Sequence, residues 1–335
     1  HQESSSKPSR EHPLYVRPPA EETADQAERR LKSLDIIAGS QMRHNASLSP
    51  VALLRPWNVK LVVREDRHEL SLSGKATTYG RGLSLAAARA SCLMEMVERA
   101  SAYLSVEDDR ILHLAEPNEL LHGSRSTIEH TFGPALDPGE YPLEVPYRDA
   151  PLCWLRGTSA AGGDVRVPVQ MAGLFSNLDE IDLFDSPGST GIATGNSVEE
   201  AKLAALLEVI ERDAEATTPF AKTGCFVLEA DPGQDPLIAR LLDDYKARGI
   251  NVQFQDITGP MGVPVFQCFV MSPKGAIARG YGAGLSAKKA VISALTETPY
   301  PYPDGEPSGP LLRKLLVKKL HELPDYSLGS PSADS

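Results

Sequence analysis

The chain has 335 residues, with 34 Lys and Arg against 45 Asp and Glu, so its formal net charge is −11. This charge disfavours a nucleic-acid binder, which needs a positive surface for phosphates, and no apolar run approaches the ~20 residues of a membrane helix. With 41% hydrophobic residues and four widely spaced cysteines, the composition favours a cytoplasmic globular protein with neither a disulfide framework nor a zinc site.

Residues 1–20 are polar and rich in Pro and Ser, which predicts a disordered N-terminal tail. The spacing of apolar residues then predicts helices and strands. In the first half of the chain we expect helices at 20–39 and 84–104 and strands at 59–65, 152–157 and 165–169. The stretch 105–150 has little periodicity, so mostly loops are expected there.

In the second half, a Gly-rich loop at 185–196 precedes a predicted helix at 197–216. The remaining predicted elements are an amphipathic helix at 235–249, strands at 250–257 and 263–271, a helix from Ser286 that the prolines of 299–303 stop, and a short basic amphipathic helix at 311–323. Strands and helices alternate throughout, which favours an α/β or α+β architecture.

Three segments can be superposed without gaps, and each reads as a turn, a helix N-cap and a helix. Each has a Gly, then Ser two positions later and Glu thirteen positions later. The glycines are Gly82, Gly195 and Gly284, the serines Ser84, Ser197 and Ser286, and the glutamates Glu95, Glu208 and Glu297. The first two segments add Glu98-Arg99 and Glu211-Arg212.

The paired glutamates are spaced three residues apart, so both carboxylates of a pair project from one helix face. Like charges placed together are unfavourable unless a cation lies between them. Grouped hard oxygen ligands suit Mg²⁺, especially one that also carries nucleotide phosphates. The alternative is a solvated helix face joined by Glu–Arg pairs. Recurrence of the pattern inside apolar stretches favours the metal interpretation.

Other motifs give weaker signals. The chain has no P-loop, since the sequence around Lys75 lacks the upstream Gly. GYGAG at 280–284 is interpreted as the turn of the third segment and not as a dinucleotide fingerprint. Ser189 and Cys92 have no base at a recognisable spacing, and Cys92 is expected in the core. No catalytic residue is therefore assigned.

Three segments carry a resemblance to a known family: 91–99 fits S-x-x-x-E-x-x-E-R, and 189–214 and 282–297 resemble further ATP-site segments of YcaO-type enzymes. GKATT at 74–78 stands in the place of the family's Gly-Lys-Gly, and 249–270 resembles its strand-turn-strand segment. The resemblance covers roughly residues 50–298.

The resemblance implies an α+β fold, with mixed sheets and long helices from the three pseudo-repeated Gly-Ser-helix-Glu segments around an ATP and Mg²⁺ site. It also implies one YcaO-like domain of several lobes at 21–325, flanked by the N-terminal tail and a tail at 326–335. The tail at 326–335 is either complete or truncated.

The implied chemistry is ATP-dependent activation of a peptide-backbone amide. A nucleophile adds to the carbonyl, and ATP phosphorylates the oxyanion so that the oxygen leaves as phosphate. A Cys, Ser or Thr of the substrate gives an azoline, whereas sulfide gives a thioamide, typically with a TfuA-like partner. The implied partners are a peptide or protein substrate, a TfuA-like or precursor-recognition protein, and a second copy in a homodimer.

Carried over by resemblance, the Mg²⁺ ligands are the five glutamates Glu95, Glu98, Glu208, Glu211 and Glu297. The nucleotide contacts are Asn196, Glu200 and Arg212. Two alternatives stay open: Asn196 only favours a turn, and Glu200 only complements the positive end of the helix dipole.

The chain departs from the family pattern at three places. Ser293 stands where the family usually has Arg, Tyr300 stands where it usually has Gln, and the chain ends in SADS without a Pro-x-Pro-x-Pro tail. The lack of a Pro-rich tail favours thioamide or accessory chemistry over ring formation. Ser293, Tyr300 and the short C-terminus motivate the alternative of a non-catalytic YcaO-like scaffold that binds a peptide or partner protein.

Overall fold

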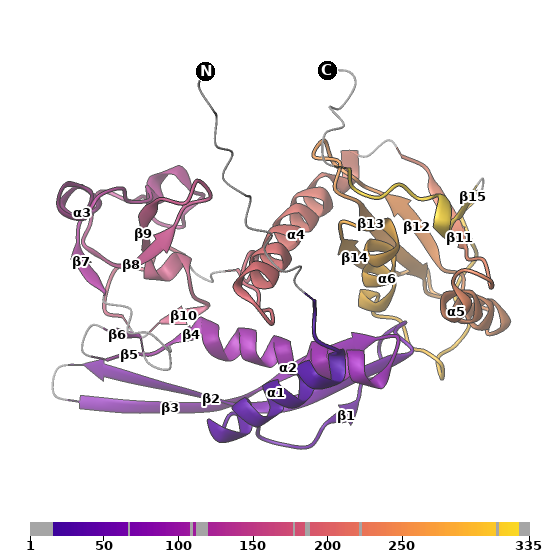
Figure 1. Ribbon diagram of the computed structural model, residues 1–335, viewed down its shortest axis with the longest axis horizontal. Helices are drawn as coiled ribbons and strands as arrows, with labels where there is room; N and C mark the ends of the chain where they lie inside the picture. Colours follow the sequence, from indigo (N-terminus) through magenta and orange to yellow (C-terminus); the bar gives the residue numbers. More distant parts are fainter. Residues whose placement is uncertain are drawn as a thin grey trace, which may run out of the picture.

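A computed structural model describes most of the chain, in the ranges 16–65, 68–107, 110–111, 120–176, 178–184, 188–220, 223–312 and 315–327. The fold is α+β, as expected. The structure has three parts (Figure 1). The first is a long hairpin with two helices, the second is a five-stranded sheet with its helices, and the third is a small three-stranded lobe. The predicted tail at 1–20 lies largely outside the described residues, and so does most of the tail at 326–335.

The hairpin is built from β2 (Val51–Glu65) and β3 (His68–Gly82), which pair antiparallel along their full length. β1 (Met42–Arg43) adds to the edge of β2. α1 (Ala20–Ser33) and α2 (Leu85–Ala102) pack against each other and against the hairpin. A long hairpin is only marginally stable alone, so the two helices supply the apolar surface that holds it.

α1 ends at Ser33, so the prediction that the helix continues to Gly39 is wrong. Asp35 has a left-handed φ of 55°, which turns the chain out of the helix. Ile37 then forms a β-bridge with Trp57, and the Ala38 amide donates to the Pro56 carbonyl (3.1 Å). The residues after Asp35 therefore pair with the hairpin and do not continue the helix.

The second part is a five-stranded sheet in the order β14-β13-β12-β11-β15. Its pairs are antiparallel except β11 with β15, which is parallel. The strands are β11 (Cys225–Glu229), β12 (Gln253–Asp256), β13 (Val265–Met271), β14 (Ile277–Ala283) and β15 (Leu316–Lys319). The helices are α4 (Val198–Thr217), α5 (Pro236–Ala247) and α6 (Ala287–Glu297).

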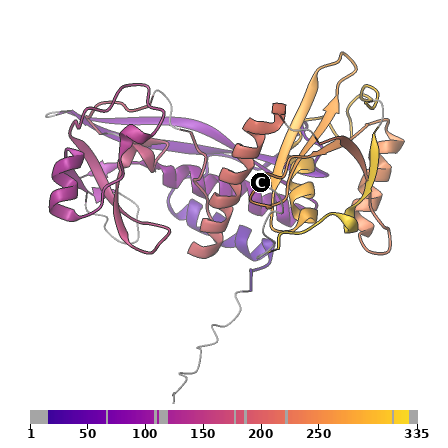
Figure 2. The same cartoon turned by 90° about the horizontal axis from the view of Figure 1, so that it is seen from above.

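The two faces of this sheet hold different helices, as strand alternation dictates. Phe266 and Cys268 belong to the core with α5 and α6. Val265 belongs instead to the core with Ile210 and Ala214, the two buried residues of α4. α4 thus contacts the sheet through one face, and it lies between the sheet and the three-stranded lobe in both views (Figures 1 and 2).

The prediction of a basic helix at 311–323 is wrong. The described residues of this segment form β15 and a short 3₁₀ turn (Leu320–Glu322). Leu316 to Lys319 pair with Phe226 to Glu229 of β11, and the Lys318 ammonium lies 4.7 Å from the centroid of the Phe226 ring. The open edge of β11 therefore decides the structure of a segment whose apolar spacing alone favoured a helix.

The third part is a lobe with its own core, which includes Trp154 and Leu183. It is connected to the hairpin part by the parallel pair of β4 and β10. Its elements are β7 (Leu121–Gly123), α3 (Arg125–Phe132), β8 (Leu152–Thr158) and β9 (Asp164–Pro168), and the short connecting strands are β4 (Tyr103–Leu104), β5 (Val106–Glu107), β6 (Arg110–Ile111) and β10 (Phe175–Ser176).

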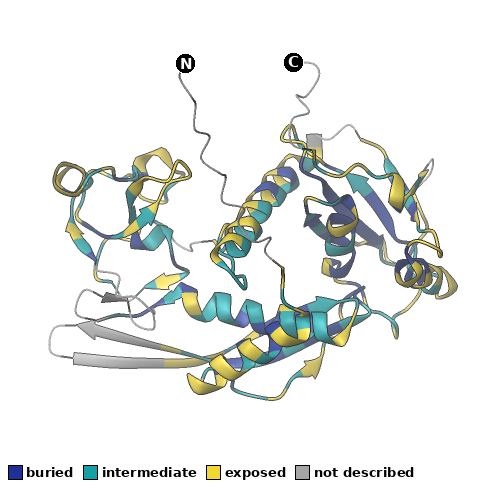
Figure 3. Ribbon diagram, viewed as in Figure 1, coloured by how far each residue is buried: buried dark blue, intermediate teal, exposed yellow. Residues whose placement is uncertain are grey.

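Burial is concentrated under the helices of the hairpin and along the five-stranded sheet, whereas only Ile210 and Ala214 of α4 are buried (Figure 3). Trp154, Phe254 and Phe266 are among the largest fully buried side chains. In the described part of the chain, no helix has both the length and the apolar character needed to cross a membrane.

Candidate functional site

The three superposable segments each begin a helix at the predicted serine. The Ser84 hydroxyl accepts from the Ala87 amide (3.2 Å), and the Ser197 hydroxyl accepts from the Glu200 amide (3.1 Å). Ser286 is at the N-cap of α6, but the Asp325 carboxylate accepts from the Ala287 amide there (2.8 Å). The caps fix where each helix starts, and therefore where its glutamates lie.

Glycines let these helices lie close to the strands. A Cβ on Gly80 would be 2.2 Å from the Ala88 carbonyl oxygen, and one on Gly282 would be 2.2 Å from the Ala290 carbonyl oxygen. GYGAG is therefore mainly strand β14, and its interpretation as a turn is wrong. Its glycines are explained by the α6 backbone, which leaves no room for a side chain.

The glutamates of α2 and α4 affect one another. Burial, with smaller contributions from Glu208 and Glu95, raises the pKa of Glu98 to about 7, although the charge of Arg99 lowers it. Burial likewise raises the pKa of Glu211 to about 7, with further contributions from Glu297 and Glu208. The five predicted carboxylates from three helices therefore lie within electrostatic reach of one another, linked in pairs.

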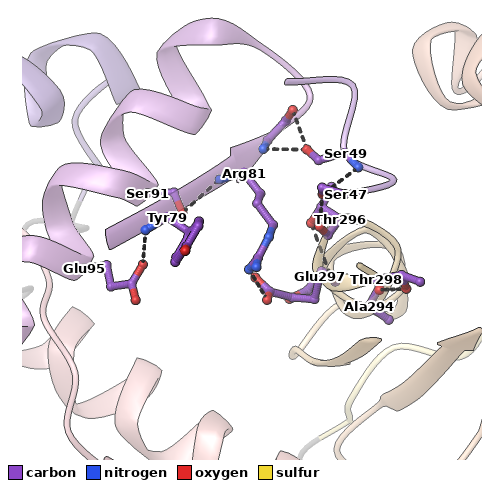
Figure 4. A network of polar contacts seen from close by, with 12 residues as sticks. Ser47, Ser49, Tyr79, Arg81, Ser91, Glu95, Ala294, Thr296, Glu297 and Thr298 are labelled. Atoms are coloured by element: carbon purple, nitrogen blue, oxygen red, sulfur yellow. Dashed lines mark hydrogen bonds and ion pairs between the residues drawn. The ribbon is translucent and has the colours of Figure 1, made fainter. Parts of the chain in front are cut away.

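Three of these carboxylates are occupied by protein donors. Glu95 accepts from the Tyr79 amide (2.9 Å), and Glu297 pairs with the Arg81 guanidinium (Figure 4). Glu211 accepts from the Ala283 amide (3.0 Å). Burial also raises the pKa of Glu95. These donors fix the positions of the carboxylates and partly satisfy their hydrogen-bonding capacity.

As these side chains stand, no three His, Cys, Asp or Glu residues of the described ranges are grouped closely enough to hold a metal ion. The donor set nevertheless fits Mg²⁺, because it consists of hard carboxylate oxygens that repel one another. A cation between them would relieve that repulsion. To hold a metal, the carboxylates would have to turn from the protein donors toward it.

The predicted nucleotide residues Asn196 and Glu200 form one network. The backbone and side-chain amides of Asn196 both donate to the Glu200 carboxylate (3.0 Å each). The Thr23 hydroxyl donates to the Asn196 side-chain oxygen (3.0 Å), and Arg17 pairs with Glu200 (2.7 Å). A segment far away in sequence thus completes the start of α4.

This network lines a cavity of about 340 Å³ between α1, α2 and the start of α4. Ser91 and Met94 of α2 and Thr194 also line it, and the Thr194 hydroxyl donates to the Met94 carbonyl (3.1 Å). The sequence analysis missed Arg17 and Thr23. They precede the first motif and belong to no spacing pattern, so only the tertiary structure reveals them.

Arg212 is not directed at the other predicted nucleotide residues. Its side chain is about half exposed and pairs with Glu215 one helical turn on (2.7 Å), which raises the pKa of Arg212. It still acts on the acidic cluster, since its charge lowers the pKa of Glu211. The pair with Glu215 uses one nitrogen, Nη1, of the Arg212 guanidinium, which has five N–H donors in all.

The departures from the family pattern have clear positions. Tyr300 is buried in the core with α6, and its hydroxyl donates to the Glu306 carbonyl (3.1 Å). Ser293 lies on α6 one turn before Glu297. Cys92 is fully buried, and burial raises its pKa, which confirms it as a core residue.

A family model described as YcaO cyclodehydratase, ATP- and Mg²⁺-binding, matches residues 79–299. The match begins after 74–78, so GKATT lies outside it. Lys75 stands in β3 opposite Asn58 of the hairpin. The same order of Gly, cation and Gly occurs inside the match, at Gly80-Arg81-Gly82.

Two curated relatives are similar in sequence. An uncharacterized protein of Methanothermobacter thermautotrophicus is 29% identical over 233 residues, covering 67% of this chain and 57% of its own. An uncharacterized protein in the tfuA 3′ region of Rhizobium leguminosarum bv. trifolii is 28% identical, covering 64% of this chain and 48% of its own. The chain thus spans about half the length of these relatives.

Two solved structures share the fold. A heterocyclase in complex with substrate and cofactor has a TM-score of 0.62 and 18% identity, covering 89% of this chain and 41% of the other. A YcaO protein from Methanopyrus kandleri, bound with AMPPCP and Mg²⁺, has a TM-score of 0.56 and 20% identity, covering 91% and 77%.

Proposed function

The chain belongs to the YcaO family, and from that premise we propose that it uses ATP and Mg²⁺ to activate a backbone amide of a peptide or protein. The observation that carries the proposal is the set of mutually repelling glutamates on α2, α4 and α6. Such a set is unfavourable without a cation and suits a nucleotide-bound Mg²⁺. We also propose that residues 21–325 act as one domain of several lobes. A cytoplasmic location stays a prediction.

Five side chains are proposed to hold Mg²⁺: Glu95, Glu98, Glu208, Glu211 and Glu297. Bound ATP supplies the phosphoryl group that turns the amide oxygen into a leaving group. Asn196 and Glu200 orient the nucleotide from the start of α4, where the positive end of the helix dipole favours anions. Arg212 binds a phosphate through donors of its guanidinium. Each role concerns positioning and charge, the main contributions to phosphoryl transfer.

The first test is calorimetric titration of the chain with AMPPCP, with Mg²⁺ or with EDTA. We expect binding that depends on Mg²⁺. A Glu98→Gln/Glu211→Gln double variant should lose that dependence, because two ligands are removed. Glu199→Gln is the matched control, since Glu199 lies on the same helix α4, is exposed, and is outside the acidic cluster. Equal effects of the double variant and its control would contradict the metal site.

Arg212→Lys tests the phosphate role separately. It keeps the charge but replaces a planar fork by a point charge. We expect weaker AMPPCP binding at saturating Mg²⁺. Unchanged affinity would remove Arg212 from the site and leave the glutamates in place.

Between the two chemical outcomes we propose thioamide formation. The similarity to a protein from a tfuA 3′ region supports it. Incubating a candidate peptide with the chain, Mg·ATP, sulfide and a TfuA-like partner should raise the peptide mass by the difference between sulfur and oxygen. A mass loss of one water without sulfide would instead indicate an azoline.

A non-catalytic scaffold that binds a peptide or a partner protein is the second candidate. It is favoured by Arg212, which pairs with Glu215, and by Tyr300, which is in the core. A chain that binds its partner but no Mg·AMPPCP would support the scaffold and contradict the enzyme.

A further inference from the structure

A second cavity, of about 400 Å³, lies at the end of α4, between this helix and the sheet. Glu215 and Thr218 line it from the helix side, and Gln267, Arg279 and Tyr281 line it from β13 and β14. Its volume is in the range of ligand pockets. We call it the α4-end cavity. It is separate from the cavity at the start of α4.

The α4-end cavity is close to the proposed Mg²⁺ ligands. Glu211 accepts from the Ala283 amide (3.0 Å). Tyr281 precedes Ala283 by two residues on β14, so both lie on one face of the strand, about 7 Å apart. On α4, Glu215 follows Glu211 by one helical turn, or about 6 Å. A strand and a helix thus both lead from a proposed metal ligand into the cavity.

Three features follow one another along α4. Asn196 and Glu200 are at its start, Glu208 and Glu211 are near its middle, and the α4-end cavity is at its end. In phosphoryl transfer the leaving and attacking oxygens lie in line, on opposite sides of the phosphorus. A nucleotide that extends from the start of α4, with its Mg²⁺-bound phosphates at the glutamates, therefore has its phosphoryl acceptor on the side of the α4-end cavity.

The lining of the cavity matches a peptide backbone. Gln267 is 5% exposed, and within the described residues its side-chain amide has one hydrogen bond, a long one to the Tyr281 hydroxyl (3.4 Å). This leaves a donor and the carbonyl acceptor of Gln267 available. Burial raises the pKa of Tyr281, so its hydroxyl stays protonated and can donate. A peptide unit has one N–H donor and one C=O acceptor, and these two side chains can serve both.

Arg279 gives the cavity a positive charge. It is exposed, and in the described part of the chain it forms no ion pair, whereas Arg212 nearby is paired with Glu215. The charge of Arg279 lowers the pKa of Tyr281, which shows that it acts inside the cavity. A guanidinium binds a carboxylate through two parallel hydrogen bonds. An acidic side chain of a bound peptide therefore complements this wall of the cavity.

We propose that the α4-end cavity binds the backbone of the substrate peptide, and that Arg279 selects segments with an acidic side chain near the activated amide. The proposal rests on the ATP- and Mg²⁺-dependent function proposed above. Arg279 is four strand residues from Ala283, and an extended peptide rises about as much per residue as a strand. The acidic side chain is therefore expected about two to four residues from the amide that is activated.

Peptide arrays test this selectivity on the full chain loaded with Mg·AMPPCP. Two arrays of capped heptapeptides share their varied positions and differ in one fixed residue, which is Glu in the first and Lys in the second. We expect several-fold stronger binding to the Glu array. Equal binding to both arrays, stronger binding to the Lys array, or binding to neither would overturn the proposal.

A charge reversal separates selectivity from folding. Arg279→Glu should reverse the preference, so that the Lys array binds several-fold more strongly. A misfolded chain would gain affinity for neither array. Lys274→Glu is the matched control, because Lys274 is exposed in the turn between β13 and β14, outside the cavity, and the charge changes equally. It should keep the preference for Glu. An unchanged preference in Arg279→Glu would contradict the role of Arg279.

Cys225 allows a test of the cavity itself. It lines the cavity from β11 and is partly exposed, whereas Cys92, Cys153 and Cys268 are buried. Burial raises the pKa of Cys225, so alkylation with N-ethylmaleimide needs a pH above neutral. The alkylated chain should lose binding to the Glu array and keep its affinity for Mg·AMPPCP. The same treatment should have no effect on Cys225→Ser. Full array binding after complete alkylation, verified by mass spectrometry, would mean that the peptide binds elsewhere.

The outcomes distinguish the two proposals. If the unmodified chain binds no Mg·AMPPCP in calorimetry, the proposed function fails. If it binds Mg·AMPPCP but shows no preference for the Glu array, only the proposed role of the α4-end cavity fails.

Discussion

The carboxylates Glu98 and Glu211 both have a pKa of about 7 in the folded chain, against an ordinary value of 4.5. Folding therefore favours their protonated forms. Their contribution to the free energy of unfolding is full below pH 4.5 and is lost as the pH rises to about 7. A difference of this size corresponds to at most about 3 kcal/mol per group.

This predicts a metal-dependent pH profile. In EDTA, the free energy of unfolding measured in urea should fall between pH 4.5 and 7. Glu98→Gln should make the fall smaller and leave stability near pH 4.5 unchanged, because the amide stays neutral. Excess Mg²⁺ should oppose the loss above pH 7, where both carboxylates are charged. An identical pH slope in Glu98→Gln and the unmodified chain would contradict this.

Glu28 affects the free energy of unfolding in the opposite direction, at pH values below 4.5. Hydrogen bonds from Lys32, Arg55 and Arg89 lower its pKa to about 2, although burial opposes them. Its contribution is full above pH 4.5 and is lost as the pH falls toward 2. Considering Glu28, Glu98 and Glu211 alone, the free energy of unfolding of the metal-free chain is largest near pH 4.5 to 5.

At the scale of elements, the contact between α2 and β3 depends on glycine. A Cβ on Gly80 would also lie 2.4 Å from the Cys92 amide nitrogen, one turn before Glu95. We expect Gly80→Ala to cost about 1–3 kcal/mol of unfolding free energy through overpacking, and to weaken AMPPCP binding because Glu95 moves with α2.

Gly74→Ala is the matched control on the same strand. A Cβ there meets nothing within 4 Å, so the change in stability should stay within about 0.5 kcal/mol. Urea unfolding and calorimetry of both variants check the prediction. Equal stability of the two variants would show that α2 can shift without loss.

The elements also show what sequence can predict. The serine caps and the apolar spacing gave the long helices nearly to the residue, because those signals are local. β15 was missed because its structure depends on the edge of β11, about 90 residues earlier. The pairing of Arg81 with Glu297 was missed for the same reason, since the two residues are adjacent only after folding. The repeated sequence pattern predicted the glutamates, but it did not predict the backbone amides and the arginine that donate to them.

At the scale of the whole molecule, the candidate site joins segments from most of the chain. Thr23 contacts Asn196, Thr194 contacts Met94, and the Ser47 hydroxyl donates to the Thr296 carbonyl (3.1 Å). The three-stranded lobe has its own core and contributes none of the predicted ligands. Ligand binding should therefore stabilise the first two parts and leave the lobe unaffected.

Hydrogen exchange measured with and without Mg·AMPPCP tests this arrangement. Bound ligand opposes every opening that breaks the site, by about 2.7 kcal/mol at a hundredfold excess over Kd. Amides of α2, α4 and α6 should exchange more slowly, whereas local exchange in β8 and β9 should not change. Protection confined to α4 would mean that the three helices do not form one site.

α4 contributes two of the proposed Mg²⁺ ligands, yet Leu203, Leu206 and Val209 on it are 42%, 58% and 45% exposed. Because α4 is held by one face, undocking it costs less free energy than undocking a helix that is buried on all sides. Apparent affinity scales with the docked fraction, so the chain would bind its nucleotide less tightly than its contacts allow. Any partner that covers this apolar face would raise nucleotide affinity without touching the nucleotide.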